Sequence, residues 1–204
     1  MNLRKSFITI SGLIIYLTYG MLSAVPVKED RLKVESGKML FTLKKKNSSG
    51  YDPDMVKSET MTGMANRASG TVNMKDRTFD ITMDVGLETF FLGGKFKFAN
   101  TRMHENYLES SKYSSVNYKG TIVSYDEESG KAKVKGKMTL HGVSKDNFST
   151  EGTVTASKSG KGYLLTVSFN VNLRDFGIQV PNTKITKIRE MVALKVKLEL
   201  VQDK

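Results

Sequence analysis

Few side chains in this sequence could support catalysis or bind a metal ion. Histidine occurs only at His104 and His141, and cysteine is absent, which removes any thiol nucleophile or thiolate ligand. His141 stands beside Gly142 where a strand is expected to end, so its simplest role is hydrogen bonding within a turn. For neither histidine does the sequence show a nucleophilic residue that it could activate, or further ligand residues that would complete a metal site. The sequence therefore predicts a protein that is not an enzyme and uses no metal or cofactor.

The first 24 residues have the pattern of a secretory signal peptide. Arg4 and Lys5 precede an apolar stretch from Phe7 to Leu22, and Ala24 supplies a small residue at the cut. This stretch is shorter than the roughly 20 apolar residues of a spanning helix, although an uncleaved membrane anchor is the alternative. We therefore expect residues 1–24 to be removed. Residues 25–204 should form one domain outside the cytoplasm. The periplasm is the location that we favour, and secretion or the outer surface are the alternatives.

The chain is strongly basic, with a net charge of +11. Its lysines and arginines are spread along the sequence, and they lack the neighbouring aromatic residues on which a single-strand nucleic-acid binder stacks bases. The charge therefore argues against nucleic acid and favours an anionic membrane surface or polysaccharide as a partner of an exported protein. Whether the chain forms a homodimer stays open.

The first half of the mature chain has a less regular pattern than the second half. Strands are predicted over three segments: 31–43, 63–74 and 77–85. The polar segment Lys44–Thr60 predicts a long loop, and Asn73–Asp76 predicts a hairpin turn. Asn100 is the expected N-cap of the one short helix, over Thr101–Leu108. Its Met103 and Tyr107 would share one face.

From Ser115 onward, apolar and polar residues alternate cleanly. Val134 and Met138 share one face of a predicted strand over 131–140, and the lysines at 131, 133, 135 and 137 occupy the other face. Further strands are predicted at 116–122, 148–156, 163–173 and 188–201. Their short connections indicate an antiparallel meander. This pattern predicts an all-β fold of about eight strands, and we favour an up-and-down barrel over a sandwich because long strands can tilt around an axis.

Three short segments carry more information than alternation does. They are Glu105–Tyr113 (ENYLESSKY), Lys137–Lys145 (KMTLHGVSK) and Phe169–Ile178 (FNVNLRDFGI). In this order and spacing they resemble the YceI-like family of exported, polyisoprenoid-binding proteins, and the resemblance covers roughly residue 63 to the C-terminus. It implies a lipocalin-like barrel with an elongated apolar pocket, which would hold an isoprenoid or quinone-like lipid as a carrier or sequestering protein.

If the resemblance holds, the inward face of the strands lines the ligand. The predicted ligand-lining residues are Val116, Tyr118, Ile122, Val134, Met138, Leu140, Leu165, Val167, Phe169, Val171, Val192, Leu194, Val196 and Leu198. Alternation alone leaves a second interpretation open, because a barrel of eight strands can be filled by its own side chains. The protein would then be a basic surface protein whose lysines bind anionic envelope or host polymers.

Three polar residues are candidates for contacts with a phosphate or quinone head of the ligand: His141, Lys145 and Arg174. Without such a head, Arg174 and Asp175 are predicted to form an ion pair that closes a strand end. The lysine row over 131–137 predicts a solvated outer face that also discourages edge-to-edge pairing of strands.

Overall fold

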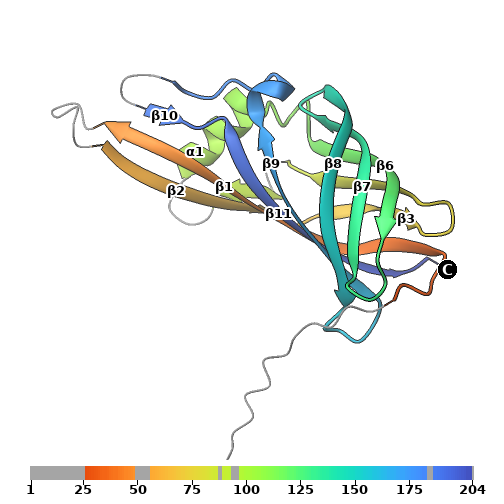
Figure 1. Ribbon diagram of the computed structural model, residues 1–204. Coiled ribbons are helices and arrows are strands. Elements are labelled where there is room, and N and C mark those ends of the chain that lie inside the picture. Colours follow the sequence, from red (N-terminus) through yellow and green to blue (C-terminus); the bar gives the residue numbers. More distant parts are fainter. Residues whose placement is uncertain (1–25, 49–55, 87–88, 93–96, 183–185, 204) are drawn as a thin grey trace, which may run out of the picture.

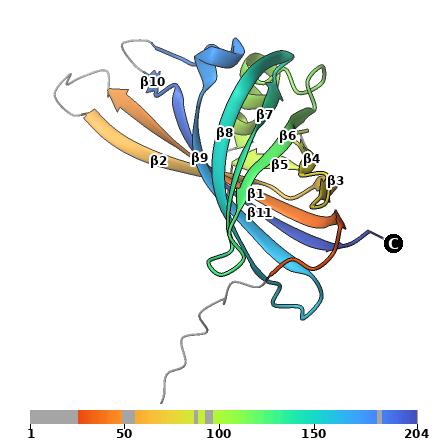
Figure 2. The same ribbon diagram turned by 45° about the vertical axis from the view of Figure 1, so that its right-hand side comes forward.

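The computed structural model describes residues 26–48, 56–86, 89–92, 97–182 and 186–203, so the predicted signal peptide lies outside it. Eight strands close into an antiparallel barrel (Figures 1 and 2). In order around the barrel they are β1 (Arg31–Ser48), β3 (Ala68–Asn73), β4 (Thr78–Asp84), β6 (Ser115–Tyr125), β7 (Lys131–Leu140), β8 (Val143–Ala156), β9 (Tyr163–Asn172) and β11 (Met191–Gln202). The pairing of β11 with β1 completes the ring. The predicted all-β, up-and-down, lipocalin-like barrel is confirmed.

Strand β1 continues beyond the barrel into an arm. Its segment Met39–Ser48 pairs with β2 (Val56–Ala65), and its far end also pairs with β10 (Thr186–Ile188). Figure 1 shows these three strands extending away from the barrel. The loop predicted over Lys44–Thr60 is therefore wrong at both ends, and only residues 49–55 between the strands lie outside the described residues. The prediction failed because pairing between distant strands provides partners that local polarity does not reveal.

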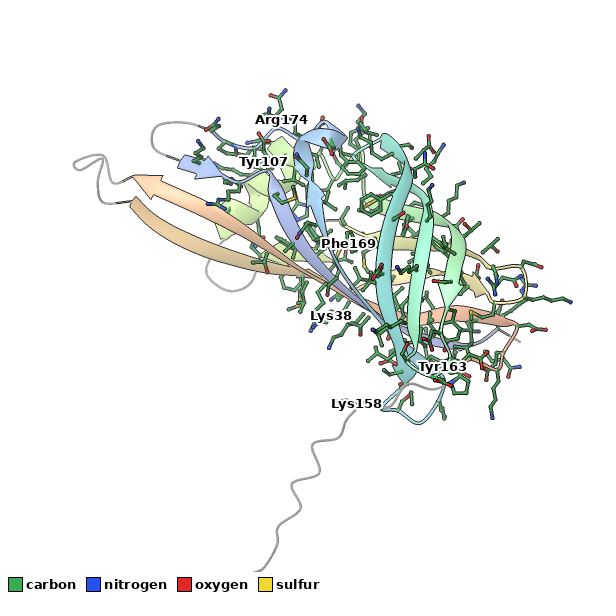
Figure 3. All side chains as sticks on the ribbon, in the orientation of Figure 1. Lys38, Tyr107, Lys158, Tyr163, Phe169 and Arg174 are labelled. Carbon is green, nitrogen blue, oxygen red and sulfur yellow. The ribbon has the colours of Figure 1, made fainter. Side chains whose placement is uncertain are left out.

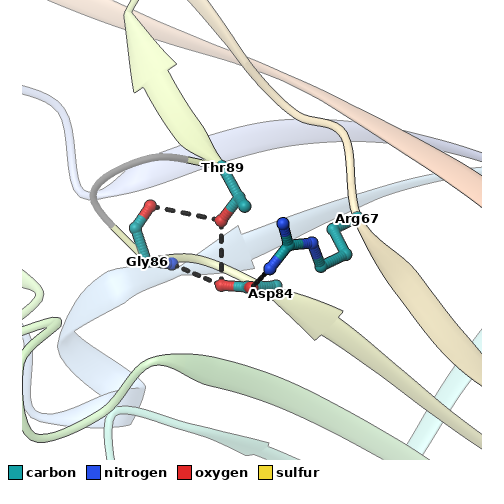
Figure 4. Close-up of polar contacts among 4 residues, drawn as sticks. All are labelled: Arg67, Asp84, Gly86 and Thr89. Carbon is teal, nitrogen blue, oxygen red and sulfur yellow. Dashed lines mark hydrogen bonds and ion pairs between the residues drawn. The ribbon is translucent and has the colours of Figure 1, made fainter.

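The wall is interrupted where the arm leaves the barrel. Asn66 and Arg67 separate β2 from β3, so the single strand predicted over 63–74 is two strands. Close by, Asp84 accepts hydrogen bonds from the Gly86 amide and the Thr89 hydroxyl, each at 2.8 Å, and pairs with Arg67 at 3.5 Å (Figure 4). This Asp84 network joins the end of β4 to the start of β5 (Phe90–Leu92).

The one α-helix of the described residues begins earlier than predicted. Helix α1 spans Lys97–Arg102 and continues as a π-helical turn, η1, over Met103–Tyr107. Asn100 is therefore not its N-cap. Its side-chain oxygen instead accepts from the Leu92 amide at 2.6 Å, and its nitrogen donates to the Leu92 carbonyl at 3.3 Å. The Asn100 side-chain amide thus provides hydrogen-bond partners for the backbone N–H and C=O of Leu92 at the end of β5. No helix among the described residues has the length and hydropathy to cross a membrane.

The turn predicted at His141 is confirmed. His141 and Gly142 form a two-residue connection between β7 and β8, with φ of 52° and 72°. Two consecutive positive φ values match the twist of a tight hairpin. This turn lies at the same end of the barrel as η1 and η2, the 3₁₀ turn over Leu173–Phe176 (Figure 1); we call this the helical end.

Candidate ligand-binding site

The barrel encloses an apolar cavity of about 230 Å³. All eight barrel strands contribute to its wall, and the helical end adds Met103, Tyr107 and Leu108. None of the described lining residues carries a charge. For comparison, an engineered apolar cavity of about 150 Å³ stays dry and binds benzene. The interior is thus large enough and apolar enough to take a small hydrophobic molecule.

All the residues predicted from strand alternation as ligand-lining are found in this wall: Val116, Tyr118, Ile122, Val134, Met138, Leu140, Leu165, Val167, Phe169, Val171, Val192, Leu194, Val196 and Leu198. Strand register brings them together. Phe169 on β9 lies opposite Leu194 on β11, and Ile122 on β6 lies opposite Val134 on β7. Their contact with a ligand stays a prediction.

The first half of the barrel also lines the cavity, although its sequence pattern did not lead us to predict an inward face there. The additional residues from this half include Leu32, Met39, Phe41, Val72, Phe79, Ile81, Met83, Val85 and Phe90. Alternation over 79–85 could have revealed four of them. Strand β1 is harder to interpret, because its register shifts between Val34 and Ser36. This irregularity moves the inward positions from even to odd residue numbers.

The three headgroup candidates lie outside the residues that line the cavity. His141 is only 12% exposed; its Nε2 lies 2.8 Å from the Glu109 carboxylate, and its Nδ1 lies 3.3 Å from the Phe176 carbonyl. Lys145 is exposed on β8. Arg174 lies at the helical end with Tyr107 (Figure 3). Headgroup contact by these residues stays a prediction.

The ion pair predicted between Arg174 and Asp175 is wrong. Arg174 pairs with Glu190, which immediately precedes the last strand, and the Arg174 backbone amide is capped by the Asn172 side chain. Neighbouring residues on a 3₁₀ turn point in different directions, so adjacency in sequence does not bring the two charges together. The pair ties η2 to the segment that precedes β11.

The opposite end of the barrel is crossed by residues Pro26–Asp30, which we call the N-terminal strap. The Tyr163 hydroxyl contacts the Glu29 carboxylate and accepts from the Lys28 amide at 3.2 Å, and the Met74 amide donates to the Asp30 carbonyl at 2.8 Å. Figure 3 shows Tyr163 at the end of the barrel away from Tyr107. Burial, and then the bond with Glu29, raise the pKa of Tyr163.

A polar cleft of about 210 Å³ adjoins the cavity at the N-terminal strap. Its charged residues include Lys28, Lys75, Arg77 and Glu127, while Val27 and Tyr125 also line the apolar cavity. The sequence pattern does not reveal this cleft, because its residues come from the strap, from two turns and from one end of β6, which only the closed barrel brings together. No group of three potential metal ligands is found among the described side chains.

Inside the cavity, one polar contact stands apart from the apolar wall. The Tyr118 hydroxyl donates to the Phe148 carbonyl at 2.8 Å. Burial raises the pKa of Tyr118, and a hydrogen bond from the Thr150 hydroxyl acts in the opposite direction. Thr150 is 7% exposed.

A domain of known structure shares this architecture. A polyisoprenoid-binding domain from Saccharophagus degradans, implicated in plant cell wall breakdown, is 14% identical with a TM-score of 0.62, covering 86% of this chain and all of that domain. BcnA of Burkholderia cenocepacia is 15% identical with a TM-score of 0.49, covering 81% of this chain and 96% of BcnA. At such identity, the first likeness shows the fold.

Similarity in sequence points the same way. A UPF0312 protein of Vibrio cholerae is 33% identical over 78 residues, which are 37% of this chain and 41% of that relative. The chain thus matches less than half the length of this relative. The model of the YceI-like domain matches residues 41–200. These residues include the cavity wall from Phe41 to Leu200, and the chain therefore belongs to the YceI-like domain family.

Proposed function

We propose that this chain is an exported lipid-binding protein that holds an isoprenoid-type chain inside its barrel. It acts as a carrier or sequestering protein and catalyses no reaction. The observation that carries the proposal is the uncharged cavity enclosed by all eight strands. An isoprenoid has almost no hydrogen-bonding groups, so an apolar wall is the surface that suits it.

The energy of an empty interior supports an occupant. Residual cavity volume costs about 24 cal/mol per Å³ in mutated cores, so this cavity, left empty, corresponds to roughly 5 kcal/mol. That cost is as large as the whole stability of a marginal domain, about 5 kcal/mol. A bound chain removes it and adds about 0.8 kcal/mol for each methylene taken out of water.

Family membership narrows the kind of occupant. The Saccharophagus domain with the same fold is a polyisoprenoid-binding domain, and the cavity of this chain has the uncharged character that such a ligand requires. The leader over residues 1–24 supports export. N-terminal sequencing of the protein from its own cells should begin at Val25, and an N-terminus at Met1 would contradict export by cleavage.

A pair of substitutions on β9 tests the pocket. Phe169 on β9 (Figure 3) lines the cavity. Its neighbour Ser168 is exposed, on the other face of the strand. We expect Phe169→Glu to abolish binding of a fluorescent apolar probe, because a carboxylate in the cavity would lack a partner. Ser168→Glu is the matched control and should bind normally. Circular dichroism and thermal unfolding establish that both variants fold, and a folded Phe169→Glu protein that still binds would contradict the proposal.

One observation favours a second candidate, binding of an anionic polymer or membrane surface at the outer face of β1 and β11. Lys38 lies directly opposite Lys197, and Lys195 is two residues away. None of these three lysines has an ion-pair partner within the described part of the chain. Like charges in opposite positions destabilise a sheet, so a bound anion would relieve this repulsion.

Vesicles separate this candidate from the first. If the outer face of β1 and β11 binds anionic lipid, the protein should sediment with phosphatidylglycerol vesicles but not with phosphatidylcholine vesicles. Added salt should release the protein from the vesicles. Lys38→Ala combined with Lys197→Ala should weaken sedimentation and leave the apolar probe bound in the barrel. Sedimentation that is unchanged in the double variant would remove this candidate.

A further inference from the structure

The polar cleft at the N-terminal strap adjoins one end of the apolar cavity. The two hollows meet at four residues that line both: Val27, Met74, Ile122 and Tyr125. The cleft has a volume of about 210 Å³, and the cavity has one of about 230 Å³. A ligand whose apolar chain fills the cavity therefore places its end group beside the cleft.

The helical end of the cavity is unsuited to a charged group. The lining residues there are Met103, Tyr107, Leu108, Leu173 and Ile178, and of these only Tyr107 carries a polar side-chain group. A charge buried against this part of the wall would lack a partner among the described lining residues. A charged head on the ligand therefore belongs at the strap end.

Three cations line the cleft. Lys28 comes from the strap, and Lys75 and Arg77 come from the turn between β3 and β4. All three are exposed, and none forms an ion pair with another described residue. Asp76, which lies between two of them in the sequence, instead accepts a hydrogen bond from the Asn73 side chain at 2.8 Å. The three cationic groups thus stay available to a ligand.

Backbone hydrogen bonds hold the turn at the rim of the cleft. The Met74 amide donates to the Asp30 carbonyl of the strap at 2.8 Å, and the Ile122 amide donates to the Arg77 carbonyl at 2.9 Å. Arg77 has a φ of 52°, in the left-handed region that residues other than glycine, asparagine and aspartate rarely adopt. An arginine at this position indicates a role for its side chain beyond forming the turn.

The carboxylates of the cleft limit which anion can bind. Glu29 is bonded to the Tyr163 hydroxyl, whereas Asp30 and Glu127 are exposed and form no ion pair with another described residue. The three carboxylates balance the three cations, so the cleft has no net charge to attract anions in general. Binding then requires direct charge-assisted hydrogen bonds to the cations. A phosphate group carries three terminal oxygens and can accept from cations on both sides of the cleft.

From this geometry we infer that the cleft binds a phosphate-type head carried on the apolar chain that occupies the cavity. The inference rests on the proposed function and specifies the class of ligand. It places the head at the strap end of the barrel, away from the candidates His141, Lys145 and Arg174. The ligand is then an amphiphile whose chain is enclosed and whose head stays in contact with solvent.

Three probes of one chain length test the inference: farnesyl phosphate, farnesol, and the hydrocarbon farnesene. Each is titrated by calorimetry, or by displacement of a fluorescent apolar probe, into delipidated wild-type protein and into the double variant Lys75→Gln with Arg77→Asn. Asparagine is chosen because it tolerates a positive φ. We expect farnesyl phosphate to bind the wild type about tenfold more tightly than farnesol at low salt, and the double variant to lose this preference.

Lys158→Gln combined with Lys161→Gln is the matched control. It removes the same number of charges from the turn between β8 and β9, at the same end of the barrel as Tyr163 (Figure 3) but outside the cleft. The control should keep the preference for farnesyl phosphate. Farnesene should bind all of these proteins with equal affinity, and equal affinity also establishes that the variants fold.

Lys28→Gln gives an independent measurement on the strap, because only the backbone amide of Lys28 bonds to Tyr163. It should lower the preference severalfold, and an unchanged preference overturns the inference even if the double variant does not fold. Equal binding of farnesyl phosphate and farnesol to the wild type, a preference that survives in the folded double variant, or an equal loss in the control also overturns it. Lipid binding stays intact in each of these cases. Failure of all three probes, farnesene included, would instead overturn the proposed function together with this inference.

Discussion

The two halves of the barrel wall line one cavity but are built differently. From β6 to β11, long unbroken strands alternate an inward apolar face with an outward polar face, as in Val134 and Met138 between the lysines of β7, although the register shifts once in the β6–β7 pair and once in the β7–β8 pair. From β1 to β5, the strands are broken at Asn66–Arg67 and after Asp84, and β1 shifts register near Ser36. The comparison indicates that the second half is specified by local pattern, whereas the first half depends on tertiary contacts that hold its interruptions in place.

The largest expected effect compares a leucine from each half. Leu32 on β1 is 1% exposed, whereas Leu165 on β9 is half-buried and faces the cavity. We expect Leu32→Ala to lower the free energy of unfolding of the delipidated protein by about 3 kcal/mol, since it opens a new void in packed surroundings. Leu165→Ala should cost at most half as much, because it enlarges a space that already exists. Denaturant titration measures the loss in the free energy of unfolding for both variants. Equal losses would mean that Leu165 is packed against other side chains and does not face an open space.

A smaller effect tests the Asp84 network as the support of the irregular half. Asp84→Ala leaves the Gly86 amide, the Thr89 hydroxyl and Arg67 without their carboxylate. We expect a loss of about 2 kcal/mol in the free energy of unfolding. The control from the regular half is Glu151→Ala, which deletes the solvent-exposed partner of Lys133 and should change stability by less than about 1 kcal/mol. A similar loss in both variants would show that the Asp84 network has no special role.

The smallest expected effect is an alkaline loss of stability that arises in the regular half. Burial raises the pKa of Tyr118 and Tyr125 on β6 and of Tyr163 on β9. A raised pKa in the folded state means that the folded protein holds the proton more tightly than the unfolded chain does. The associated stability is present below pH of about 10, the ordinary pKa of tyrosine, and is lost as pH rises through the folded value. Tyr118→Phe should make unfolding less sensitive to pH above 10; an unchanged dependence would exclude a contribution from Tyr118.

The same comparison explains what could be predicted from the sequence. Alternation with period two fixes which side of a strand faces inward, so the wall from Val116 to Leu198 follows from the sequence once a barrel is assumed. It fails at β1, where one extra residue reverses the inward positions, and over 44–60, where polar residues pair with distant strands. The partner of Arg174 likewise depends on the path of the chain after η2, which brings Glu190 beside it.

The site shows the same limit. The apolar face of β6 is visible in the sequence, but the hydrogen bond from the Tyr118 hydroxyl to the Phe148 carbonyl is not, because it reaches across β7 at Gly136. The polar cleft at the N-terminal strap is hidden for a similar reason. Sequence pattern predicts the apolar character of the cavity wall, whereas the positions of the polar groups in and beside it depend on which strands become neighbours.

Native mass spectrometry of the protein purified without detergent from its own cells tests the central claim most directly. The account predicts a mass greater than that of the mature chain by one molecule with a long apolar chain, which organic solvent releases and which Phe169→Glu lacks. A folded protein that carries no such mass, and that takes up no apolar probe afterwards, would contradict the claim that the barrel is a lipid-binding site.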